Sequence, residues 1–134
     1  MVKRIITVCA AGLITVSTAT PTKDNDAARK AAIEWLELVD AGKYQEAASQ
    51  ASQEIRGFEQ WLNYLATQRG PLGRVNKRHF VEMSHASTVS GVPEVRSYDV
   101  IRFKTSFERK PSTPETVTIA KVGCCWEIFC YENK

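Results

Sequence analysis

Beyond the first 26 residues, the spacing of apolar residues changes once along the chain, at Gly73. Between Ala27 and Gln68 the apolar residues recur every three or four positions, as they do on one face of an α-helix. This spacing predicts helices over 26–41, from Lys43 or Tyr44 to residue 55, and over 58–68. We therefore expect the first half of the domain to be helical.

After Gly73 the apolar period falls to two, which is the period of a strand with one buried face. The alternation predicts four strands, over about 75–87, 97–108, 115–122 and 125–132. Helices followed by a strand meander indicate the α+β class, with the N-terminal helices packed on one face of a four-stranded antiparallel sheet. We expect one such domain, covering residues 27–134.

The first residues have the layout of a secretory signal peptide. Basic Lys3 and Arg4 precede an apolar run over 5–16, and small residues follow as far as Ala19. The run is about 12 residues long, well short of the roughly 20 that a membrane-spanning helix needs. We therefore predict a signal peptide over 1–19, a polar leader over 20–26, and a mature protein that is secreted or periplasmic without stable membrane insertion.

Charge argues against nucleic acid as a partner. The formal net charge is +3, from 18 basic and 15 acidic residues. Removal of the signal peptide takes away Lys3 and Arg4 and leaves the mature chain almost neutral. A nucleic-acid-binding domain usually carries a strongly basic patch.

Removal of Cys9 with the signal peptide would leave three cysteines, at positions 124, 125 and 130. An odd number leaves at least one without a partner in the monomer. Cys130 would lie about 20 Å from Cys124 along a strand, too far for a disulfide. A bond between the neighbours Cys124 and Cys125 would be strained, so we expect instead that one of them can form a disulfide between two chains.

The sequence contains no recognisable catalytic, cofactor-binding or metal-binding motif. His79 and His85 lie about 20 Å apart on one strand and cannot share a metal ion. Arg69 ends a predicted helix, where the helix dipole favours a cation and by itself explains the residue. The alternative is a partly buried network in which Arg69 or Arg78 pairs with Glu115 or Asp40. Three of these residues are candidates for ligand binding: Arg69, Arg78 and Glu115.

The order of residues resembles a family of short secreted bacterial proteins known only as domain of unknown function family 4019. The resemblance covers about residues 28–131. It implies no established activity, cofactor or catalytic residue, and a fold similar to a cystatin-like or nuclear-transport-factor-like roll. The residues that carry it are Trp35, Leu36, Leu38, Val39, Asp40, Gly42, Tyr44, Trp61, Arg69, Pro71, Leu72, Gly73, Gly91, Val92, Pro93, Thr105, Ser106, Phe107, Lys110, residues 115–118, Trp126, Ile128 and Tyr131.

The chain departs from the family pattern at two positions. Ala48 stands where the pattern tends to have a tryptophan, and Cys130 where it tends to have a glycine. An alanine in place of a large aromatic residue leaves a void unless the helix moves inward. The resemblance therefore predicts a pocket beside Ala48, between the second helix and the sheet, with Ala48 as a further candidate for ligand binding.

These observations together favour a non-enzymatic protein. We expect it to bind a small ligand or a protein partner through the concave face of the sheet or an exposed sheet edge. One alternative is an isomerase- or hydratase-type enzyme that uses a cavity of the roll, with His79, Asp40 or Glu115 as the acid–base group. Another is an oligomeric assembly protein, such as a homodimer joined by sheet edges or by the turn cysteines.

Overall fold

The helices precede the long strands along the chain, as expected for the α+β class. The computed structural model describes residues 17–18, 23–88 and 96–134. The helices are α1 (Lys23–Asp40), α2 (Tyr44–Ser49) and α3 (Phe58–Arg69), followed by the 3-10 helix η1 (Gly70–Leu72). The strands are β1 (Ser17–Thr18), β2 (Val75–Ala86), β3 (Tyr98–Phe107), β4 (Lys110–Val122) and β5 (Cys125–Glu132). Most of the predicted signal peptide lies outside the described residues.

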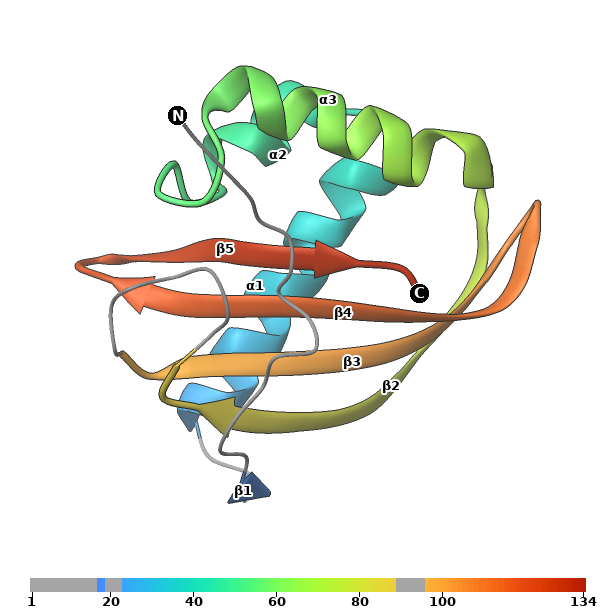
Figure 1. Ribbon diagram of the computed structural model, residues 1–134. Helices are drawn as coiled ribbons and strands as arrows, with labels where there is room; N and C mark the ends of the chain where they lie inside the picture. Colours follow the sequence, from blue (N-terminus) through green and yellow to red (C-terminus); the bar gives the residue numbers. More distant parts are fainter. Residues whose placement is uncertain (1–16, 19–22, 89–95) are drawn as a thin grey trace.

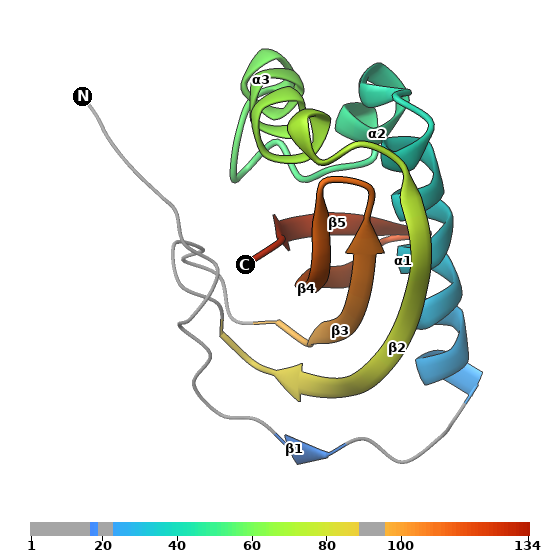
Figure 2. The same ribbon diagram turned by 90° about the vertical axis from the view of Figure 1, so that its right-hand side faces the viewer.

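The strands form one antiparallel meander in the order β1-β2-β3-β4-β5. Four of them are long, which confirms the predicted four-stranded sheet, and β1 adds two residues to the outer side of β2. Helix α1 crosses one face of the sheet, while α2 and α3 lie beyond its β5 edge (Figure 1). Seen from the side, β2 curves strongly around the others (Figure 2).

The core lies between α1, the two following helices and one face of the sheet. Trp35 and Trp61 are buried, and each donates its indole N–H to a backbone carbonyl, of Ala47 at 2.9 Å and of Ser52 at 2.9 Å. Both tryptophans therefore belong to the core. The other buried members are Ala28, Ala32, Leu36, Val39, Ala47, Ala48, Ala51, Leu65, Ile101, Phe103, Val117, Ile119, Ile128 and Tyr131.

Helix α2 ends at Ser49, six residues before the predicted end, because the following backbone pairs with the edge of β5. The amide of Ser52 donates to the carbonyl of Ile128 at 2.7 Å, and the amide of Ile128 donates to the carbonyl of Gln50 at 3.2 Å. These hydrogen bonds replace those that another helical turn would make. At the other end of the helical half, α1 begins at Lys23 rather than at residue 26, so part of the expected polar leader is helical.

Strand β4 begins at Lys110, five residues before its predicted start. The segment 111–114 contains two prolines and was expected to be a loop, yet Pro114 pairs with Lys104 of β3. Strand β5 pairs with β4 only from Thr116 onward, so this part of β4 has a partner on one side alone. Prolines are tolerated there because the missing N–H groups can face away from the ladder.

Candidate functional site

Four charged side chains meet in the interior where α1, α3, β2 and β4 come together. This group, called the ion cluster below, consists of Asp40, Arg69, Arg78 and Glu115. Asp40 ends α1 and Arg69 ends α3, while Arg78 lies in β2 and Glu115 in β4. Asp40 accepts hydrogen bonds from both arginines, and Arg78 also binds Glu115. The cluster thus joins both helix ends to the sheet.

Arg78 bridges the two carboxylates of the cluster. Its Nη1 and Nη2 lie 2.7 and 3.2 Å from the two oxygens of Asp40, and its Nε lies 2.8 Å from Oε1 of Glu115. Burial alone would lower the pKa of Arg78, but its hydrogen bonds to Asp40 and the attraction of Glu115 outweigh burial and raise this pKa above its ordinary value. Arg78 therefore stays charged.

Glu115 is 0% exposed, and both of its carboxylate oxygens are satisfied. Arg78 and the hydroxyl of Thr105 donate to Oε1, the latter at 2.6 Å, and the hydroxyl of Tyr131 donates to Oε2 at 2.5 Å. Burial raises the pKa of Tyr131 well above its ordinary value, and the charge of Glu115 raises it further. Tyr131 is therefore a neutral donor, and the buried carboxylate has the partners that burial of a charge demands.

Arg69 is 3% exposed, and its contacts go beyond the interaction of a cation with the helix dipole. Its Nη2 lies 3.2 Å from Oδ1 of Asp40, and its Nη1 donates to the carbonyl of Gly73 at 2.6 Å. Its guanidinium also lies over the ring of Phe107, 4.6 Å from the ring centre. Arg69 thus fixes the turn that leads from α3 into the sheet.

The alternative of a partly buried network between these residues is confirmed. The structure brings Arg69, Arg78 and Glu115 together with Asp40, although their positions are far apart in the sequence. The two positive and two negative charges balance, and their hydrogen bonds go to one another and to neighbouring groups of the protein. This arrangement can hold elements in place, but it leaves little capacity to bind a charged ligand.

Sequence reasoning missed Thr105 and Tyr131 as members of the site. Thr105 could have been found, because it is a polar residue on the same predicted face as Phe103 and Phe107. Tyr131 could not, because strict alternation from the inward-facing Ile128 points it outward. A register shift in the pairing of β4 with β5 turns it inward, opposite Val117.

The predicted pocket beside Ala48 is not present. Ala48 is 0% exposed, so no water-sized probe reaches any of its atoms. It packs in the core with Ala47 and Ala51. Neither of the two hollows described next is lined by Ala48.

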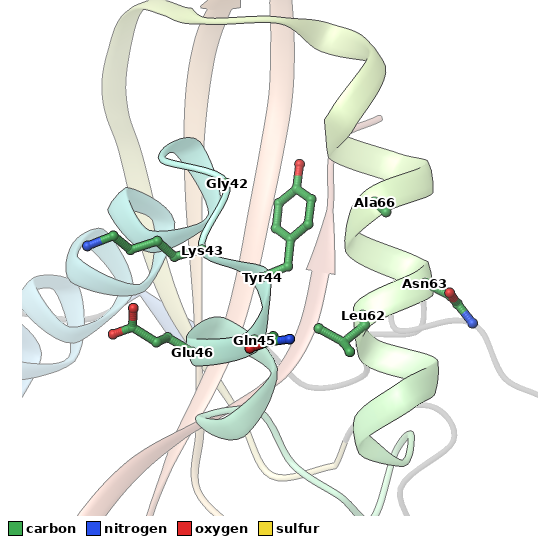
Figure 3. A pocket seen from close by; sticks show the side chains of 8 residues that line it. All are labelled: Gly42, Lys43, Tyr44, Gln45, Glu46, Leu62, Asn63 and Ala66. Carbon is green, nitrogen blue, oxygen red and sulfur yellow. The ribbon is translucent and has the colours of Figure 1, made fainter.

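An open hollow of about 580 Å³ lies between α2 and α3. Figure 3 shows the ring of Tyr44 and the side chain of Leu62 projecting into the space between these helices, with Ala66 one turn further along α3. Gly42 and four polar residues complete the lining: Lys43, Gln45, Glu46 and Asn63. A second open hollow, of about 560 Å³, follows the polar face of α1 and is lined by Asp26, Arg29, Lys30, Ile33, Glu34 and Glu37.

The two turn cysteines are bonded to each other. Cys124 and Cys125 form a vicinal disulfide, which corrects the expectation that such a bond would not form. While it is closed, neither sulfur can join a second chain, so a disulfide between chains would require it to open first. Cys130 is buried and is also disulfide-bonded.

The two histidines lie apart from the ion cluster. His79 is exposed on β2, opposite Lys104, while the Nδ1 of His85 contacts Oδ1 of Asp99. Among the residues that the structure describes, no three His, Cys, Asp or Glu side chains lie close enough to hold a metal ion. In the same part of the chain, no helix is long and apolar enough to cross a membrane.

Comparison with known proteins adds a family but no function. The model of a family described as "Protein of unknown function (DUF4019)" matches residues 31–131, which include every element from α2 to β4 and most of α1 and β5. No curated protein and no solved structure matches the chain. The cystatin-like or nuclear-transport-factor-like roll therefore stays a prediction.

Proposed function

We propose, from the premise that this chain belongs to the DUF4019 family of proteins of unknown function, that it is an exported, non-enzymatic binding domain. It works in the periplasm or outside the cell and holds a small ligand in the hollow between α2 and α3. The observation that carries this proposal is the hollow itself, together with the way in which its walls are fixed.

The volume of the hollow lies in the range of small-molecule sites, and the hollow is open to solvent. Ligand pockets commonly measure about 300–1,000 Å³ and combine apolar walls with a few polar groups. Here Tyr44, Leu62 and Ala66 form the apolar part, and the polar side chains of Gln45 and Asn63 belong to the lining. These features suit a ligand with a flat apolar ring and a polar substituent, since such a ring can stack on Tyr44.

The ion cluster supports this reading by holding both walls of the hollow. Asp40 lies just before residues 42–46, which form one wall, and Arg69 lies one turn after Ala66 in the other. The hydrogen bonds between Asp40 and Arg69 therefore tie the two walls together at one end. Arg69, Arg78 and Glu115 would then be positioning residues that never touch the ligand.

The enzyme alternative receives no comparable support. An isomerase or hydratase would need an acid–base group that faces a cavity. Asp40 and Glu115 are instead engaged by arginine within the packed interior, and His79 lies on another surface. None of these three residues lines either of the two hollows described above.

Native mass spectrometry tests the proposal. The chain purified from its own host without reductant should show a mass above that of the bare polypeptide, and this excess should vanish on denaturation. The variant Ala66→Arg fills the hollow and should be recovered without the extra mass. The control Thr67→Arg adds the same charge at the next residue of α3, which does not line the hollow, and should retain it.

Two results would contradict the proposal. A bare mass for the wild-type chain means that no ligand is held through purification. Equal retention of the ligand by both variants means that the binding site lies elsewhere.

A further inference from the structure

The two edge regions of the sheet, along β2 and β5, differ in what lies against them. Helices α2 and α3 lie beyond the edge of β5 (Figure 1), and the backbone of residues 50–52 exchanges hydrogen bonds with the N–H and C=O of Ile128 there. Within residues 17–18, 23–88 and 96–134, the outer edge of β2 pairs only at Ser84 and His85, with the two residues of β1. An uncovered strand edge presents unpaired N–H and C=O groups that can accept another strand.

The segment that covers β2 belongs to the predicted signal peptide. Ser17 and Thr18 lie directly before Ala19, where cleavage is predicted, so export would remove β1 and expose the edge that it covers. We propose that this edge, over Met83–Ala86, is a docking site for an extended segment of a partner polypeptide, which adds to the sheet antiparallel to β2. This inference rests on the proposed export of the chain, and β1 is the placeholder that occupies the site before cleavage.

A second observation points to the same place. The hydroxyl of Ser84 is buried and has no hydrogen-bond partner, although Ser84 is only 3% exposed. A buried hydroxyl without a partner costs free energy, so a partner residue that brings a polar group opposite Ser84 is favoured. In β1 the residue opposite Ser84 is Thr18, and the one opposite His85 is Ser17. Thr18 leaves the hydroxyl of Ser84 without a partner, so we expect a docked segment with a longer polar side chain opposite Ser84 to bind better than the β1 sequence does.

The shape of β2 favours a short segment over a second copy of the chain. The pairing of β2 with β3 shifts between Phe80 and Glu82, which places a bulge at Val81, and β2 bends sharply (Figure 2). Bulges and curvature at an edge work against long pairing between two sheets. Regular pairing is thus confined to the few residues after the bulge, a length that suits a peptide strand.

Hydrogen exchange of the mature chain tests the proposal with a defined probe. The probe is a synthetic peptide of residues 14–19 (Ile14–Ala19) with added lysines for solubility, and its control carries Ser17→Pro, which removes a backbone donor. Amides of 83–86 should exchange roughly tenfold faster in the chain 20–134 than in the full chain, since the loss of one net hydrogen bond is of that size. The probe should restore protection, and the proline peptide should not. Amides near Ile128 should stay protected throughout, as an internal control.

Three outcomes would overturn the proposal. Equal exchange in the full and mature chains means that β1 does not cover the edge. Failure of the probe to protect 83–86, or equal protection by both peptides, means that the edge does not accept a strand. Protection of the mature chain without any probe, together with a doubled mass in solution, means that a second copy is the occupant. The N-terminal sequence of the exported protein tests cleavage separately.

Discussion

Replacement of Arg78 by methionine should destabilise the domain severely, because it removes the cation that pairs with the buried carboxyl group of Glu115. Arg78 is mostly buried, and Glu115 is completely buried. Removal of one partner from a buried ion pair costs about 3–5 kcal/mol. The whole free energy of unfolding of a domain is typically about 5–15 kcal/mol, so the variant should lose a large share of it.

The chain offers a matched control on the surface. Arg102 binds Glu82 at 2.8 Å, the same distance that separates Arg78 from Glu115. The side chains of Arg102 and Glu82, however, are both well exposed. Arg102→Met should therefore cost no more than about 1 kcal/mol. Urea unfolding followed by the fluorescence of the buried Trp35 and Trp61 reports both variants, with the slope m showing whether the unfolded state has changed.

A double variant separates the lost charge from lost packing. Glu115→Gln introduced together with Arg78→Met removes the unpaired charge and keeps one oxygen, which can accept from either Thr105 or Tyr131, while the amide NH2 can donate to the other hydroxyl oxygen. We expect the double variant to be more stable than Arg78→Met alone. Its loss of unfolding free energy would then be well below the sum of the losses of the two single variants. The reasoning fails if Arg78→Met costs no more than Arg102→Met, or if the two substitutions in the cluster are additive.

Two further predictions concern pH and packing. Burial raises the pKa of Tyr131, and also those of Tyr64 and Tyr98, so the unfolded chain releases these protons first as the pH rises. Stability should be full below about pH 10 and fall as the pH climbs through the native values. A urea midpoint that stays constant between about pH 9 and about pH 11, one unit on either side of the ordinary tyrosine value, would contradict this. Ala48→Trp restores the aromatic residue of the family pattern but has no room, so it should cost about 1–3 kcal/mol or more by thermal unfolding. An unchanged melting temperature would show that a void does exist beside Ala48.

The class of the fold could be predicted from the sequence because both halves of the chain have a strong apolar period. The limits of α2 and β4 could not, because their causes are not local. Backbone pairing with β5 ends α2, and the lack of a β5 partner allows prolines within β4. Propensity describes what a segment prefers alone, whereas these two boundaries depend on what lies beside it.

The ion cluster was only half predictable for a related reason. Arginine and carboxylate residues in a neutral domain indicate that pairs can form, but not which pairs. The choice of Arg78 with both Asp40 and Glu115 depends on strand register and on the place where α1 ends. The part played by Tyr131 depends on a register shift within β5 that no periodicity reveals.

Because residues 50–52 pair with Ile128, the helical half of the domain depends on the last strand for its structure. A chain that lacks β5 leaves the backbone groups of Gln50 and Ser52 without partners, and Glu115 loses the hydroxyl of Tyr131. The helical half therefore has no complete structure until the last strand has been synthesised and has docked. Contacts between such distant parts of a chain form slowly, because loop closure precedes any gain from the contact. We therefore expect the complete fold to form only after β5 has left the ribosome.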